Sequence, residues 1–94
     1  MARSTSFNVT YDAGSDVLYI SVRREAAARA IEDQRGIVWR YGPDGDLIGA
    51  TIMDFGDLWS DKPEELAEEL ARRFDMPSAQ TMIVVERALE DIRH

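Results

Sequence analysis

The chain has 94 residues, of which 45% are hydrophobic, and its formal net charge is −7. This length predicts one domain, residues 1–94, with a single core, and the absence of cysteine excludes disulfides and thiolate-ligated metals. The acidic charge argues against nucleic acid as a partner, and no apolar stretch approaches the roughly 18 residues of a membrane span. Because the N-terminus also has no apolar stretch typical of a secretory signal, we expect a cytoplasmic protein.

The first third of the chain predicts a β-hairpin. Residues 7–11 alternate apolar and polar side chains, which is typical of a strand, and residues 17–22 are rich in β-branched and aromatic side chains. Between them, residues 12–16 combine Asp, Gly and Ser, which favour turns. Residues 23–35 carry mixed charges, and we expect a charged excursion there with a short strand at 29–32.

A second hairpin is predicted by two apolar runs that flank a strong turn signal. Residues 36–41 and 47–55 have strand-like composition. In the intervening loop, Pro43 presets the backbone for the second turn position, and Gly45 can adopt the left-handed conformation. The two strands are therefore expected to pair antiparallel through a loop of three to five residues.

A helix is predicted to begin at Ser60 or Asp61. Asp61 and Glu64 have the spacing of a capping box, and Pro63 is tolerated in a first turn. Apolar residues recur at helical spacing along one stripe: Leu66, Ala67, Leu70, Ala71 and Phe74. Two favourable acid–base pairs lie on the other side of this helix: Glu68–Arg72 and Glu69–Arg73. Residues 75–77 should end the helix.

The C-terminal segment has two interpretations. Residues 78–92 favour a helix, because good helix formers continue after position 86. The β-branched run at 82–85 leaves a strand as the alternative. We expect the helix.

Together these elements predict an α+β fold. The expected architecture is an antiparallel β-meander of about four strands, followed by one or two C-terminal helices that pack on the sheet. Residues 7–55 would form the meander, and residues 56–94 would form a helical extension.

The alternation of side chains predicts that both faces of the sheet carry apolar residues. The face expected to point inward includes Phe7, Val9, Tyr11, Leu18, Ile20, Val22, Ile37, Trp39, Tyr41, Ile48, Ala50 and Ile52. The opposite face would carry Val17, Tyr19, Val38, Leu47 and Met53 beside Ser21, Arg40 and Thr51. A solvated antiparallel face should be more polar. Either the second helix covers it or a partner does, and these five apolar residues are the candidate interface.

The candidate chemical groups are carboxylates at the turns. Asp12 and Asp16 flank the first turn, where such residues usually cap the backbone but can also do acid–base work. Asp54 could join Asp57 and Asp61 around a hard cation. His94 is the only histidine and stands at the C-terminus, so no histidine-based catalytic or zinc site can be assembled within the chain. We therefore predict no catalytic residue, no cofactor and no metal.

Residues 9–55 resemble a known bacterial family. The resemblance rests on these segments: Tyr11-Asp12, residues 16–20, residues 36–38, Asp44-Gly45, residues 47–49 and residues 52–54. The pattern is similar to that of the YuzE-like family, domain of unknown function 2283. The resemblance implies a small antiparallel sheet with helices and brings no known activity or active-site residues. The chain departs from the pattern at Arg40 and Thr51, and residues 56–94 are not matched.

Two classes of function follow from these observations. Residues 54–75 carry eight acidic and three basic side chains, so the predicted helix there has an acidic face. The first class is a non-enzymatic module that binds protein or oligomerises, by self-association as a dimer or through a small basic partner that docks on this acidic helix. The family resemblance adds an antitoxin-like role to this class. The alternative is a small-ligand-binding protein or an enzyme that uses Asp12, Asp16 and Asp54. Binding of nucleic acid through Arg23, Arg24, Arg29 and Arg35 is disfavoured by the net charge.

Overall fold

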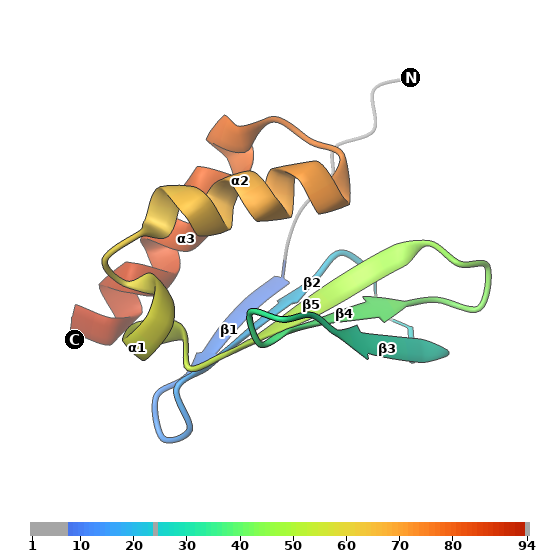
Figure 1. The fold of residues 1–94 in the computed structure, drawn as a ribbon, viewed down its shortest axis with the longest axis horizontal. Coiled ribbons are helices and arrows are strands. Elements are labelled where there is room, and N and C mark those ends of the chain that lie inside the picture. The colour runs from blue at the N-terminus through green and yellow to red at the C-terminus, as the bar shows by residue number, and fades with distance from the viewer. Residues whose placement is uncertain (1–7, 24, 94) are drawn as a thin grey trace.

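The computed structural model describes residues 8–23 and 25–93, which form a five-stranded sheet and three helices. The strands are β1 (Asn8–Asp12), β2 (Val17–Ser21), β3 (Arg29–Glu32), β4 (Ile37–Tyr41) and β5 (Leu47–Met53). The helices are α1 (Phe55–Trp59), α2 (Pro63–Phe74) and α3 (Ser78–Arg93). Figure 1 shows α2 and α3 above one face of the sheet, with α1 at its end. The predicted α+β class is confirmed. The sheet has five strands where about four were expected, and β3 is the short strand expected at 29–32.

The strand order differs from that of a simple meander. All neighbouring strands are antiparallel, and the order across the sheet is β1-β2-β5-β4-β3. The chain leaves β2, crosses to the far edge to form β3, and returns through β4 to place β5 beside β2. Strand β5 is therefore central, paired on both sides, whereas β1 and β3 are edge strands.

The turn between β4 and β5 forms as the sequence predicts. Gly45 has φ of +88°, a conformation that glycine adopts without steric cost. Its amide donates to the carbonyl oxygen of Gly42 at 3.0 Å, and the amide of Gly42 donates to the carbonyl oxygen of Asp46 at 2.8 Å. The five-residue loop 42–46 thus closes the hairpin.

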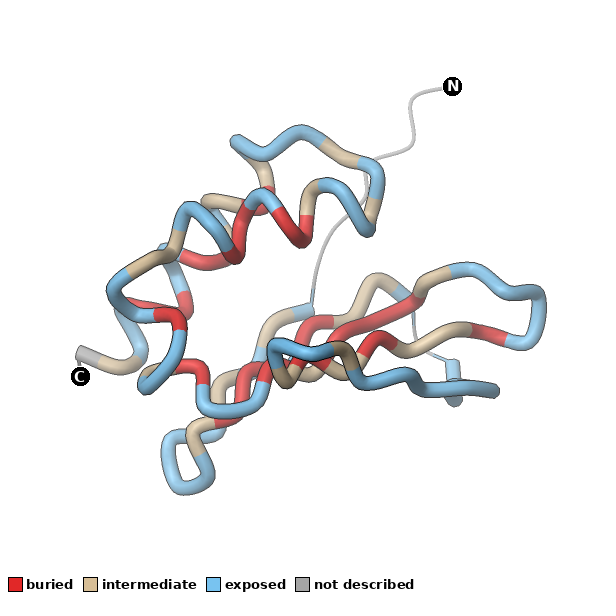
Figure 2. The backbone as a smooth tube through the Cα atoms, viewed as in Figure 1, coloured by how far each residue is buried: buried red, intermediate tan, exposed pale blue. Residues whose placement is uncertain are grey.

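The core lies between the sheet and the helices. Figure 2 shows the buried residues concentrated where these two layers face each other. The buried cluster combines sheet and helix residues: Leu18, Ile20, Ile37, Trp39, Ala50, Ile52, Phe55, Trp59, Leu66, Ala67, Leu70, Val85, Ala88 and Leu89. This confirms the apolar stripe of α2 and most of the predicted inward face. Phe7, which we assigned to that face, lies outside the described residues.

The helical region differs from the prediction at its beginning. The strand β5 ends at Met53, and residues 55–59 form the short helix α1. Helix α2 starts at Pro63, after an N-cap residue, Lys62, that makes no side-chain capping hydrogen bond. The predicted capping box is therefore wrong. Helix α2 ends as expected, at Asp75, which has φ of +55°.

The C-terminal segment is a helix over Ser78–Arg93, as we expected. The strand alternative for residues 82–85 is wrong, because Val85, Ala88 and Leu89 share one helical face and join the buried core. Burial of this face against the rest of the core outweighs the strand preference of the β-branched run.

One acid–base pair of α2 has a different role from the one predicted. Glu69 is only 7% exposed, and it binds both Arg72 and Arg73. Arg73 also stacks over the ring of Trp39, with its guanidinium carbon 4.7 Å from the ring centroid. This pair therefore joins α2 to the sheet instead of lying on a free helix surface.

The buried hydroxyl of Thr81 gives a direct test of the contact between α2 and α3. Its Oγ1 lies 2.6 Å from the carbonyl oxygen of Ala67. Thr81→Val keeps the shape but removes the donor, so we expect a loss of about 1–2 kcal/mol in the free energy of unfolding, measured by urea denaturation. The same change at exposed Thr10 should stay within about 0.5 kcal/mol. Equal effects at the two positions would contradict this packing.

Candidate functional site

The first candidate region is the junction between the β1–β2 turn and α1, where Asp16 binds the start of the helix. Its Oδ1 accepts hydrogen bonds from the hydroxyl of Tyr11 at 2.6 Å and from the amide of Gly56 at 2.7 Å. Its Oδ2 accepts one from the amide of Asp57 at 3.2 Å, and its carbonyl oxygen accepts one from the amide of Phe55 at 3.0 Å. Asp16 therefore caps α1 from a distant part of the chain.

The local backbone explains why this arrangement needs its particular residues. Asp16 and Asp54 both have positive φ, 58° and 52°, a conformation that Asp tolerates better than most residues. Asp54 occupies the N-cap position but makes no side-chain capping hydrogen bond, so Asp16 supplies the cap instead. A Cβ at Gly56 would lie 2.9 Å from Oδ1 of Asp16, and glycine is therefore required for this close approach.

The electrostatics of the junction follow from these hydrogen bonds. Burial alone would raise the pKa of Asp16, but the bonds donated by Tyr11, Gly56 and Asp57 outweigh it and hold the pKa below its ordinary value. The hydrogen bond to Asp16, together with burial and the nearby negative charges, raises the pKa of Tyr11 to about 12. The carboxylate is thus kept ionised and the phenol is kept protonated.

Three carboxylates meet at this junction. Asp16, Asp54 and Asp57 each offer an oxygen within 4.8 Å of the others, a donor set of the kind that hard cations use. Asp16, however, already accepts three hydrogen bonds through its side chain, and the capping of α1 accounts for its position. Of the predicted trio, Asp12 lies apart in the turn, where its Oδ1 accepts the amide of Gly14 at 3.0 Å.

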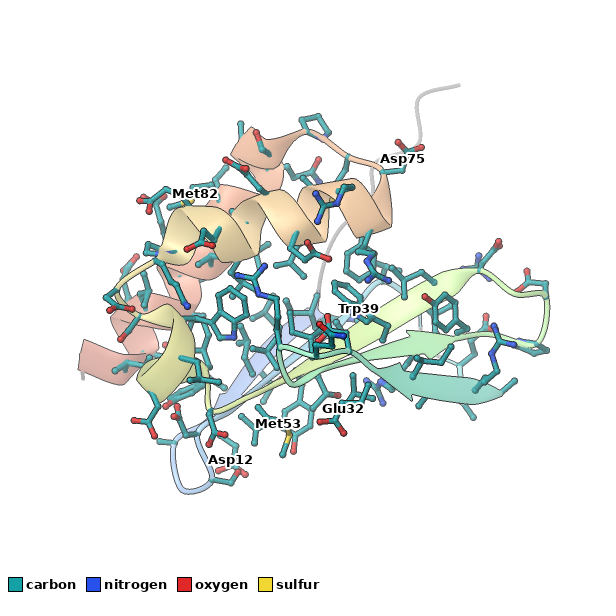
Figure 3. The ribbon with its side chains drawn as sticks, viewed as in Figure 1. Asp12, Glu32, Trp39, Met53, Asp75 and Met82 are labelled. Atoms are coloured by element: carbon teal, nitrogen blue, oxygen red, sulfur yellow. The ribbon has the colours of Figure 1, made fainter. Side chains whose placement is uncertain are left out.

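The second candidate region is the face of the sheet that points away from the helices, which we call the outer face. The register places its residues in three rows across the strands. These rows are Asp12–Val17–Met53, Thr10–Tyr19–Thr51–Val38–Glu32, and Asn8–Ser21–Gly49–Arg40–Ala30. In Figure 3 the side chains of Asp12, Met53 and Glu32 lie below the sheet, whereas Trp39 points toward the helices.

The candidate interface residues are not equivalent in the structure. Tyr19 and Met53 are 39% and 42% exposed, and Val38 is half-buried beside them. Val17 is on the same face but is only 4% exposed. Leu47, which strict alternation assigned to this face, packs against the core. A register shift between Arg40 and Tyr41 places Leu47 opposite Tyr41, which faces inward.

Arg40 is an outer-face residue that our sequence analysis placed on this side but did not identify as functional. Its guanidinium lies over Gly49, so that a Cβ at that glycine would be 3.4 Å from Nη2 and 3.6 Å from Nε. The Nε atom is buried and has no hydrogen-bond partner. The available signal was Gly49 itself, because a glycine inside a central strand often marks a close approach.

Three of the other arginines that we considered have partners among the described residues. Arg23 forms ion pairs with Glu25, Asp44 and Asp46, and Arg29 stacks over Tyr41. Arg35 pairs with Glu65 and stacks over Trp59. Arg24 and His94 lie outside the described residues.

Hollows also occur on the surface formed by the described residues. A groove of about 490 Å³ is lined by Pro63, Glu64, Met82, Glu86, Leu89 and Glu90. A second hollow of about 390 Å³ is lined by Glu32, Gln34, Arg35, Gly36, Leu58, Trp59 and Lys62. Neither set of lining residues holds a nucleophile next to a general base.

The comparisons with known proteins give one match. The family described as a protein of unknown function (DUF2283) matches residues 8–55, which span the five strands and the first residue of α1. No curated protein and no solved structure matches the chain. No helix in the described residues is long and apolar enough to cross a membrane.

Removal of the Asp16 charge tests the cap of α1. Because the pKa of Asp16 is lower in the folded state, its stabilisation is present above the unfolded pKa of about 4 and is lost as the pH falls through the folded value. We expect Asp16→Asn to lower the free energy of unfolding at pH 7 by about 1–3 kcal/mol, and this difference should shrink below about pH 4. Asp57→Asn, an exposed neighbour, should change it by less than about 0.5 kcal/mol. A difference that is independent of pH would contradict the role of the charge.

The phenol of Tyr11 gives a second pH test. Because its folded pKa of about 12 exceeds the unfolded value of about 10, its stabilisation is complete below pH 10 and is lost as the pH rises through 12. Absorbance titration should show one of the three tyrosines ionising near pH 12. Tyr11→Phe should remove that transition. If the highest transition stays in the variant, the assignment to Tyr11 is wrong.

Proposed function

The chain belongs to the DUF2283 family, whose description names no activity, and we propose that it is a non-enzymatic module that self-associates through the outer face. The observation that supports this most strongly is that α2 and α3 lie over one face of the sheet only (Figure 1). On this face Tyr19, in the middle row, and Met53, in an end row, remain partly accessible. The two side chains are diagonal neighbours in the register, and apolar side chains exposed together are typical of a docking site.

The charges of the outer face favour a second copy of the chain as the occupant. Arg40 and Glu32 have opposite charges, and neither has an ion-pair partner within residues 8–23 and 25–93. A two-fold interface brings the same surface of each copy together, so that residue i of one copy meets residue j of the other in both directions. A face that carries both signs is therefore complementary to itself.

The size of the outer face sets the expected strength of the dimer. Five strands about 4.8 Å apart and about 17 Å long present a projected area of about 400 Å². Stable complexes commonly bury about 800 Å² on each partner. We therefore expect a dimer that dissociates on dilution, and the measurements below need a concentration series.

A small basic protein is the second candidate partner, and an antitoxin-like role would belong to this class. The groove beside α3 supports it, because Glu64, Glu86 and Glu90 surround the apolar side chains of Met82 and Leu89. Glu86 and Glu90 are like charges one helical turn apart, which a cationic side chain would relieve. The alternative of a carboxylate enzyme has less support, because Asp16 is engaged in capping α1.

A charge placed on the outer face should abolish self-association. Lysine at position 53 would be buried in the dimer without a partner, so Met53→Lys should raise the dissociation constant by at least about tenfold. Sedimentation equilibrium over a concentration series measures this change. Ile83→Lys is the matched control, since Ile83 is 60% exposed on α3, and it should associate as the wild type does. A wild-type chain that stays monomeric at millimolar concentration would overturn the proposal.

A further inference from the structure

We infer that Arg40 of one copy pairs with Glu32 of the other across the outer-face dimer, and that this reciprocal pair determines how the two copies fit. The inference rests on the proposed self-association and adds the residues that give it specificity. It is based on three features of the described residues: the position of the Arg40 side chain, the exposure of Glu32, and the register that relates the two strands.

The Arg40 guanidinium is held on the outer face with unused donors. It lies over Gly49 because that position has no Cβ, and the strand pairing places Gly49 directly opposite Arg40. No ion pair to Arg40 occurs among the described side chains. Its Nε is buried, so the terminal nitrogens are the donors that a carboxylate from another copy would meet. A guanidinium fixed in this way is suited to bind a carboxylate supplied from outside the chain.

Glu32 is the carboxylate that the same face offers. It ends the edge strand β3, whose four residues are all exposed, and Figure 3 shows its side chain on the side away from the helices. Asp12, the other acidic residue of this face, already accepts a hydrogen bond from the amide of Gly14. The side chain of Glu32 forms no ion pair with another described residue.

The register explains why these two residues do not simply pair within one chain. Ala30 stands opposite Arg40, and Glu32 stands opposite Val38, so Arg40 and Glu32 are diagonal neighbours. Diagonal positions are about 7–8 Å apart, which long side chains can span. The Arg40 side chain instead turns toward β5 and Gly49, and the two charges remain available for another copy.

A two-fold interface satisfies both charges at once. The pair forms twice, because each copy contributes one Arg40 and one Glu32. A desolvated charge that loses its partner is costly, and like charges placed opposite each other repel. Reversing the charge of either residue alone should therefore weaken association of the two copies strongly. Reversing both charges should leave association nearly unchanged.

A charge-swap experiment tests this pairing with full-length chains. The variants are Arg40→Glu, Glu32→Arg and the double variant, studied by sedimentation equilibrium alone and as an equimolar mixture of the two single variants. Each single variant alone should raise the dissociation constant at least about tenfold. The dissociation constants of the mixture and of the double variant should return to within about threefold of the wild-type value, because every Glu then faces an Arg of the other copy.

The outcomes separate this inference from the proposal on which it rests. A wild-type chain that does not dimerise overturns both. A wild-type dimer with unaffected single variants, or with a mixture no stronger than the single variants, overturns the pairing and leaves the outer-face dimer intact. If a reversed variant fails to fold by circular dichroism, Arg40→Met and Glu32→Gln replace it. The dimer of the double neutral variant should then have a dissociation constant no higher than that of either single variant. If the losses of association free energy in the two single variants add in the double variant, the pairing is wrong.

Discussion

The carboxylate of Asp16 is the contact on which the arrangement of this molecule depends. It joins the first hairpin to the start of α1 through bonds to the amides of Gly56 and Asp57. Helix α1 is followed in the chain by α2 and α3, whose apolar faces are buried in the core against the sheet. The hydroxyl of Tyr11 and the edge of its ring against Phe55, with centroids 5.9 Å apart, strengthen the same junction from the core side.

Because α2 and α3 lie over one face of the sheet (Figure 1), the described helices leave the outer face uncovered. The outer face combines partly exposed Tyr19 and Met53 with the charges of Arg40 and Glu32, which form no ion pair within the part of the chain that the structure describes. Gly49 is closely approached from the neighbouring strand β2 as well, because a Cβ there would lie 2.8 Å from the carbonyl oxygen of Ile20. A larger residue at position 49 of β5 would therefore collide with the backbone of β2 and also crowd the Arg40 side chain.

The sequence predicted the features that depend on local patterns, and it missed those that depend on distant contacts. The β4–β5 hairpin and the stripe of α2 follow from turn chemistry and periodicity, which act within a few residues. Asp16 was identified as a turn carboxylate, but its helix partners lie 40 and 41 residues away. Leu47 was placed on the wrong face because alternation fails at the register shift beside Tyr41. The capping box predicted at Asp61 is absent because α2 begins only at Pro63, after Lys62. The local pattern also gave no indication of α1.

The most direct test of the account is to observe which side chains of two copies touch. An isotope-filtered NOE experiment on a mixture of labelled and unlabelled chains, at a concentration where the dimer is populated, reports only contacts between copies. We predict intermolecular NOEs from the methyl group of Met53 to the ring of Tyr19 or the methyl groups of Val38. Intermolecular NOEs that arise only from helix residues such as Ile83, with none from the outer face, would contradict the account.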